Sequence, residues 1–263
     1  MPAFAWVQAY RFVTCPQPVA AIRFLSDGRR NVAKAGDAKV GKYVMRDYLS
    51  PERGRAALLT IDAQCDFALP NSPAKVCGTM AAVPAMRRLL DSFRERTQPI
   101  VHVVRLYRCD GSNVELCHRA AIEEGQRIVM PGSSGAELVE ALKRDKTQRL
   151  EPEVLLAGQF QRLGPNEHVM YKPRWSAFYQ TTLEEHLRAL GVTTLLVCGC
   201  DLPRGPRATI YAASNRDFRI VLVTDAVSGT SEVGLRELSQ MGIYLMTAEQ
   251  SLGWLARDGQ RAA

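Results

Sequence analysis

From residue 56 onward, short apolar runs alternate with segments whose apolar residues recur at helical spacing. The runs cover residues 56–61 (AALLTI), 99–106 (PIVHVVRL), 167–172 (EHVMYK), 193–200 (TTLLVCGC), 219–226 (RIVLVTDA) and 243–247 (IYLMT). A run that is apolar on both faces is typical of a strand in a sheet covered on both sides. Parallel strands need crossover helices. The alternation therefore predicts a three-layer α/β/α sandwich around a roughly six-stranded parallel sheet.

Helical segments separate these runs. We expect helices over residues 80–96, 135–144, 181–191, 206–216 and 232–242. The serines of PGSS precede the second of them and can cap its first turn. Gly191 ends the third, since glycine adopts the left-handed conformation common at helix C-termini.

Residues 1–50 differ in composition from the rest of the chain. The stretch SDGRRNVAKAGDAKVGK is rich in Gly, Ala and cations and has no sustained apolar period. We therefore expect an N-terminal extension over 1–50 and a single domain over 51–263. An Arg-containing, acid-poor targeting segment is the alternative interpretation of this extension.

Charge and cysteine content narrow the class of protein. The formal net charge of +7 is spread through mixed segments, so we expect a solvated basic surface and no nucleic-acid partner. No apolar run approaches the ~20 residues of a membrane span, and the N-terminus lacks a secretory apolar region. The seven cysteines show neither a disulfide framework nor paired zinc-ligand spacing. These features predict a cytoplasmic protein with reduced thiols and no metal.

Three strand ends carry the candidate chemistry, because ligands of parallel α/β sheets bind beyond the carboxyl ends of the strands. Asp62 follows the first run, where a carboxylate can serve as a general acid or base or only cap a loop. Lys172 ends the third run, as a charge partner or as a surface lysine. After Cys200, Pro206 favours a helix start with Gly205 at the N-cap. Amides at such a helix end favour an anion.

Four stretches in order, LLTIDAQCDF, VMYKPRWSAFYQTTLEEHL, LLVCGC and RATIYAASNRDFRIVLVTDAVSG, resemble the isochorismatase-like cysteine hydrolases. The resemblance implies an Asp–Lys–Cys catalytic triad in which Asp62 and Lys172 match the Asp and Lys. Gly205 occupies the position of the nucleophilic Cys. It also implies a non-proline cis peptide at Cys200–Asp201 and an oxyanion hole formed by the amides of Asp201 and Gly205.

The same resemblance extends to the surrounding pocket. We expect Gln64, Phe67, Trp175 and Phe178 to contact substrate, with core packing an equal alternative for Phe178. Arg174 and Arg204 either bind a substrate carboxylate or are solvated at the surface. Nicotinamidases of this group place an Asp and two His shortly after the first strand, and residues 63–80 contain no His. We therefore expect no metal and no cofactor.

The glycine leaves two hypotheses open. In the first, the protein is a hydrolase of a small planar substrate, with Asp62 as acid/base aided by Lys172. True isochorismatases, which cleave a vinyl ether, carry Gly at this position, whereas hydrolysis of amide or other C–N bonds in the family uses the Cys. In the second, the chain is a pseudoenzyme, or an engineered Cys-to-Gly variant, that binds a small molecule without turnover.

Two other cysteines lie near these motifs. Cys65 follows Asp62 by three residues and is the weaker alternative as a replacement nucleophile, while Cys200 lies on the strand and does not replace the missing thiol. Both are expected to pack as small apolar residues. Relatives are often oligomeric, so we expect a homo-oligomer acting on a small-molecule substrate.

Overall fold

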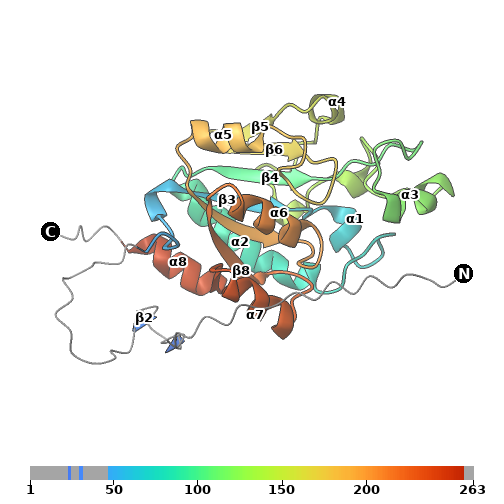
Figure 1. The fold of residues 1–263 in the computed structure, drawn as a ribbon. Helices are drawn as coiled ribbons and strands as arrows, with labels where there is room; N and C mark the ends of the chain where they lie inside the picture. Colours follow the sequence, from blue (N-terminus) through green and yellow to red (C-terminus); the bar gives the residue numbers. More distant parts are fainter. Residues whose placement is uncertain (1–22, 25–29, 32–46, 258–263) are drawn as a thin grey trace, which may run out of the picture. The chain divides into compact units, whose positions relative to one another are not determined.

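The computed structural model describes residues 23–24, 30–31 and 47–257 (Figure 1). Residues 47–257 belong to one compact unit. In the preceding part of the chain, the short strands β1 (Arg23–Phe24) and β2 (Arg30–Asn31) pair antiparallel. Residues 47–50 of the expected 1–50 extension are part of the unit that begins at Asp47, and residues 1–22, 25–29 and 32–46 lie outside the described residues. Among the described helices, none is long and apolar enough to cross a membrane.

A seven-stranded sheet forms the centre of this unit, in the order β5-β6-β4-β3-β7-β8-β9. Its strands are β3 (Ala56–Ile61), β4 (Ile100–Val104), β5 (Gln161–Gly164), β6 (Glu167–Tyr171), β7 (Thr194–Gly199), β8 (Arg219–Val227) and β9 (Tyr244–Met246). The six predicted strands pair in parallel, as expected. The seventh, β5, was not predicted and pairs antiparallel with β6 at the edge. It is short and partly exposed, so its sequence lacks an apolar run.

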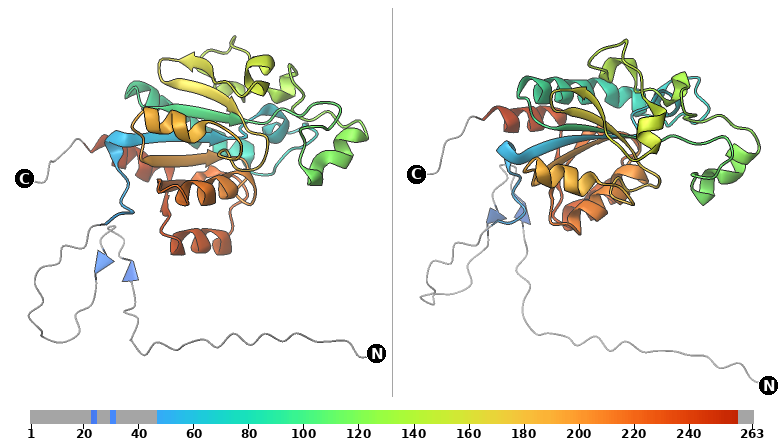
Figure 2. Two further views of the ribbon diagram at one scale, coloured as in Figure 1. Left: turned by 45° about the horizontal axis from the view of Figure 1, so that its top comes forward. Right: turned by 90° about the horizontal axis from the view of Figure 1, so that it is seen from above.

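Helices cover both faces of the sheet, which confirms the three-layer sandwich (Figures 1 and 2). On one face, α2 (Thr79–Glu95) and α8 (Ala248–Ala256) share a core with alternate residues of β3, such as Leu58. On the other face, α5 (Leu183–Ala189), α6 (Gly205–Ser214) and α7 (Glu232–Gln240) pack over Leu59 and Ile61. The shorter elements are η1 (Arg53–Arg55), α1 (Cys65–Ala68), α3 (Leu116–Glu123), η2 (Ser134–Ala136), η3 (Glu140–Leu142) and α4 (Pro152–Leu156).

The predicted helix over 135–144 is wrong. Residues 134–142 form only the two short 3-10 turns η2 and η3, because the backbone between them pairs with the chain that follows β3. The Cys65 amide donates to the Glu137 carbonyl at 2.8 Å, and the Val139 amide donates to the Ala63 carbonyl at 3.1 Å. Ser133 still caps η2 through the Ala136 amide. Tertiary pairing thus overrides the local helical pattern.

Gly199, the last residue of β7, tolerates no side chain. Its φ is +123°, and a Cβ there would lie 2.0 Å from the Ile61 carbonyl oxygen. Because the obstacle is backbone, we expect Gly199→Ala to lower the free energy of unfolding by about 3 kcal/mol or more. Gly253→Ala is the matched control: it faces open space in α8 and should stabilise by about 0.5–1 kcal/mol. Equal urea midpoints for the two variants would contradict this prediction.

Candidate active site

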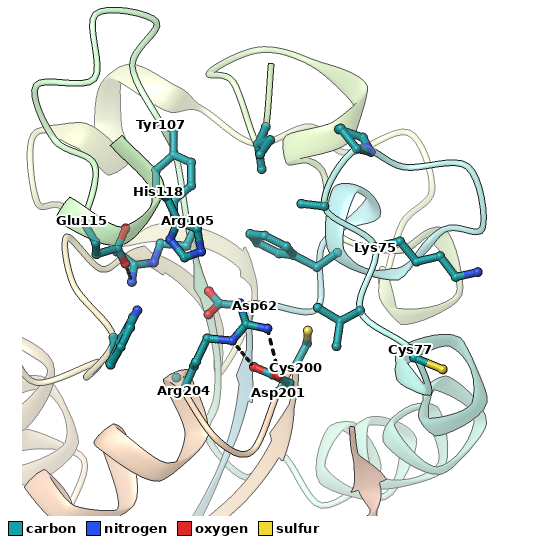
Figure 3. A pocket seen from close by; sticks show the side chains of 17 residues that line it. Asp62, Lys75, Cys77, Arg105, Tyr107, Glu115, His118, Cys200, Asp201 and Arg204 are labelled. Carbon is teal, nitrogen blue, oxygen red and sulfur yellow. Dashed lines mark hydrogen bonds and ion pairs between the residues drawn. The ribbon is translucent and has the colours of Figure 1, made fainter. Parts of the chain in front are cut away.

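A cavity of about 460 Å³ lies at the carboxyl ends of the central strands (Figure 3). The residues lining it are Asp62, Phe67, Pro73, Ala74, Lys75, Val76, Cys77, Arg105, Tyr107, Glu115, His118, Ile128, Trp175, Cys200, Asp201, Arg204 and Gly205. Seven of the residues discussed from the sequence therefore meet at one place: Asp62, Phe67, Trp175, Cys200, Asp201, Arg204 and Gly205. The volume is in the usual range for a small-molecule site.

Asp62 and Lys172 form a buried ion pair at the floor of this cavity. Asp62 directly follows β3 with a positive φ of 51°, and Lys172 directly follows β6. The Lys172 ammonium donates to Asp62 Oδ2 at 2.7 Å. Burial lowers the pKa of Lys172 to about 8, although the neighbouring Asp62 carboxylate raises it. Asp62 Oδ1 is buried and accepts no hydrogen bond from the described residues. One carboxylate oxygen is thus held by the lysine and the other is left for a ligand or water.

Gly205 lies directly beside this pair. It is the first residue of α6, with Arg204 at the N-cap, so the helix begins one residue earlier than its Pro206 predicts. A Cβ on Gly205 would lie 2.9 Å from Asp62 Oδ2 and 3.5 Å from Lys172 Nζ. A side chain at position 205 would therefore project onto the carboxylate and the ammonium.

The loop between β7 and α6 brings two free amides to the same edge. The Cys200–Asp201 peptide is cis, as the resemblance implied. In the part of the chain that the structure describes, neither the Asp201 nor the Gly205 amide donates to a protein acceptor. The Asp201 carboxylate accepts two hydrogen bonds from Arg204, at 2.9 and 3.1 Å. Arg204 is therefore paired within the protein, while its half-exposed side chain still lines the cavity.

Another part of the cavity lining comes from the segment that runs from the end of β4 into α3. The sequence analysis did not single out its residues. Arg105 and Glu115 are buried and form an ion pair. His118, on α3, lies near the ring of Tyr107, with the two ring centroids 6.3 Å apart. Burial lowers the pKa of His118, and the charges of Arg204 and Arg105 lower it further. The position of Arg105, at the carboxyl end of an apolar run, was a signal equal to that of Asp62. The loop that carries the others has no such pattern.

Two of the expected ligand contacts, Gln64 and Phe178, lie elsewhere, and so does Arg174, for which carboxylate binding was one of two alternatives. Gln64 is fully buried, and its amide bonds the backbone of Arg105 and Ala136, so it fixes the loops and does not line the cavity. Phe178 lies in the core against Phe218, with the ring centroids 5.8 Å apart. Arg174 donates to backbone carbonyls of the neighbouring loops. These side chains are used for packing and hydrogen bonding, which a motif match does not reveal.

The two cysteines considered from the sequence, Cys65 and Cys200, are poorly placed to replace the missing nucleophile. Cys65 lies outside the cavity, and burial raises the pKa of its thiol. Cys200 lines the cavity but is buried, and burial raises the pKa of its thiol to about 12. The six cysteines within the described residues are free, and Cys15 lies outside them. No group of three or more His, Cys, Asp or Glu within the described residues could hold a metal ion.

The sheet, parallel except for β5, thus brings a carboxylate–ammonium pair and two free amides to the carboxyl ends of its strands, which is where α/β proteins bind small molecules. A profile of the isochorismatase domain matches residues 56–250 of this chain. The chain belongs to the isochorismatase family.

Individual relatives agree with this assignment. The chain is 31% identical over 206 residues to a protein of Arabidopsis thaliana named "Probable inactive nicotinamidase", covering 76% of this chain and 96% of that one. It is 34% identical to the solved structure of an isochorismatase family protein from Desulfovibrio vulgaris, with a TM-score of 0.66 over 77% of this chain and 99% of that one. N-carbamoylsarcosine amidase from Thermoplasma acidophilum shares the fold at 23% identity, with a TM-score of 0.58 over 74% and 97% of the two chains.

Proposed function

We propose that this protein hydrolyses a small planar substrate, of amide, other C–N or vinyl-ether type, without a covalent intermediate. Asp62 is the general acid/base and Lys172 holds it in place. The observation that carries the proposal is Asp62 Oδ1, a buried carboxylate oxygen of a cavity-lining residue, which has no hydrogen-bond partner among the described residues. Buried polar groups are almost always hydrogen-bonded, so this oxygen is the natural acceptor for a water or substrate proton.

For an amide, water bound to Asp62 Oδ1 gives a proton to that oxygen as the water oxygen attacks the carbonyl carbon. The amides of Asp201 and Gly205 donate to the oxyanion that forms. Asp62 then returns the proton to the leaving nitrogen as the C–N bond breaks. Throughout, the Lys172 ammonium remains on Oδ2. For a vinyl ether, protonated Asp62 gives its proton to the vinyl carbon. Water then adds to the resulting oxocarbenium ion and returns a proton to Asp62, and the hemiketal breaks its C–O bond to release a carbonyl compound and an alcohol.

A second candidate is a protein that binds such molecules without turnover. Two observations favour it. The Arabidopsis relative is named "Probable inactive nicotinamidase". Asp62 Oδ2 also lies only 2.9 Å from where a Cβ at position 205 would be, so the carboxylate fills part of the space of the missing side chain. Loss of a nucleophile typically costs several orders of magnitude in rate.

One experiment separates the hydrolase from the binding protein without turnover. It measures turnover of isochorismate and several small amides by the unaltered protein and by Asp62→Asn. We expect Asp62→Asn to lower kcat/KM at least about a hundredfold, since general acid–base groups contribute 10²–10⁴. Asp91→Asn, at a partly exposed position of α2, is the matched control and should leave kcat/KM unchanged. Cys65→Ser should also leave the rate unchanged, because Cys65 lies outside the cavity. Binding of panel compounds with no turnover by either protein would favour the second candidate.

A further inference from the structure

Besides Asp62 and Lys172, the cavity has a second buried pair of opposite charges, formed by Arg105 and Glu115. Arg105 and Glu115 are only 2% and 7% exposed, yet both line the cavity. Figure 3 shows the Glu115 carboxylate beside the Arg105 guanidinium at one side of the pocket. Arg105 also donates through Nη1 to the Lys172 carbonyl at 3.2 Å, so this second pair is tied to the chain beside the Asp62–Lys172 ion pair.

The guanidinium has more donors than the protein uses. Arginine carries five N–H groups, and the bonds to Glu115 and to the Lys172 carbonyl leave others free. Glu115, for its part, is an acceptor with two oxygens. The pair therefore offers the cavity a hydrogen-bond donor and an acceptor side by side, both held by burial.

Charge balance argues against a carboxylate ligand at this second pair. The lining carboxylates of Asp62, Glu115 and Asp201 are matched by Lys172, Arg105 and Arg204 respectively. The remaining lining cation, Lys75, lies between α1 and α2, and its side chain points away from Arg105 and Glu115 (Figure 3). An anion placed on Arg105 would face the Glu115 carboxylate in a poorly solvated position, where like charges repel strongly. A neutral group that accepts from Arg105 and donates to Glu115 meets no such repulsion.

We propose that the Arg105–Glu115 pair selects a neutral planar group with C=O and N–H side by side, as in a lactam, cyclic imide or ureide. Arg105 donates to its oxygen and Glu115 accepts from its N–H. The rings of Tyr107, His118 and Trp175 line the same cavity and suit a flat ligand. This inference names the substrate class of the proposed function and rests on it for the site, but binding tests it without turnover.

The first test compares three probes on the full chain by ligand-observed NMR: 2-pyridone, N-methyl-2-pyridone and benzoate. N-methylation removes only the N–H that Glu115 would accept, and benzoate presents an anion. We expect 2-pyridone to bind about tenfold more tightly than the other two, the effect of one hydrogen bond to a charged group. Equal affinities for the two pyridones, tighter binding of benzoate, or no binding of any probe at millimolar concentration would each overturn the proposal.

Glu115→Gln gives a reciprocal test. It should weaken 2-pyridone binding several-fold and strengthen benzoate binding, because the guanidinium loses its counter-charge. Glu124→Gln, exposed just beyond α3, is the matched control. A Glu115→Gln variant with a lower Tm and an unchanged ratio of the two affinities would show a purely structural ion pair. If that variant does not fold, the comparison of the three probes on the unaltered protein still decides. Failure of turnover with the expected binding pattern would refute the proposed hydrolysis and leave this inference standing.

Discussion

Gly205→Cys is expected to raise the rate of amide hydrolysis about a thousandfold or more, by restoring a nucleophile whose loss costs up to ~10⁶ in comparable triads. The new Cβ would lie 3.5 Å from Lys172 Nζ and 2.9 Å from Asp62 Oδ2. Asp62 must therefore shift by a few tenths of an ångström, which a single side chain can do. The thiol would then have a general base beside it, and the first turn of α6 and the ammonium would favour its thiolate.

The measurement is kcat/KM on the same panel of small amides, with mass spectrometry for the acyl-enzyme. Gly205→Ala adds the Cβ without the thiol and should stay at the level of the unaltered protein. Adding Asp62→Asn to Gly205→Cys should remove the gain. A Gly205→Cys thiol that reacts with iodoacetamide but turns over no amide would mean that the remaining groups are no longer arranged for hydrolysis.

Lys172→Met is expected to lower turnover about a thousandfold, within the range for loss of acid–base function. Without the ammonium, the buried Asp62 carboxylate has no charge partner among the described residues and loses the contact that holds it in place. Removing one partner of a buried pair also destabilises by about 3–5 kcal/mol. The double variant Asp62→Leu/Lys172→Met removes both charges and should recover much of that stability in urea unfolding. Full activity in Lys172→Met would exclude a role for the pair.

The same lysine predicts how stability depends on pH. Its pKa is about 8 in the folded protein and 10.5 ordinarily. Between these pH values the unfolded chain holds a proton that the folded chain has released, so raising the pH favours folding. Below pH 8 the lysine is protonated in both states and its contribution is constant. Urea unfolding from pH 7 to 10.5 should therefore show stability rising relative to Lys172→Met above pH 8. A constant difference would contradict the lowered pKa.

The positions of Asp62 and Lys172 in the site could be predicted because the ends of the strands can be recognised in the sequence. Each central strand is apolar on both faces, and Asp62 and Lys172 are the first charged residues after two of them. Since parallel strands end at one edge, residues 110 positions apart meet there. Gly205 could be placed at the same edge because Pro206 predicts that a helix begins there, directly after the strand that ends near Cys200.

Apart from Arg105, the cavity residues between β4 and the end of α3 could not be predicted in this way. Glu115 and His118 reach the cavity through a loop and a short helix whose path depends on tertiary contacts, including those of Asn113 with the Leu106 carbonyl and Tyr171. Gln64 was predicted to contact substrate because it belongs to a recognised motif. Its side chain instead forms hydrogen bonds to loops that no local sequence pattern specifies. Side chains that depend on loop geometry need the structure to be placed.

The buried Asp62–Lys172 pair also bears on the history of the chain. Replacing a buried ion pair by apolar residues of similar volume is often neutral or stabilising. A scaffold whose site had no remaining task could therefore lose this pair without losing stability. The protein instead keeps the pair at the floor of its cavity, as expected of a site that still binds or acts on a ligand.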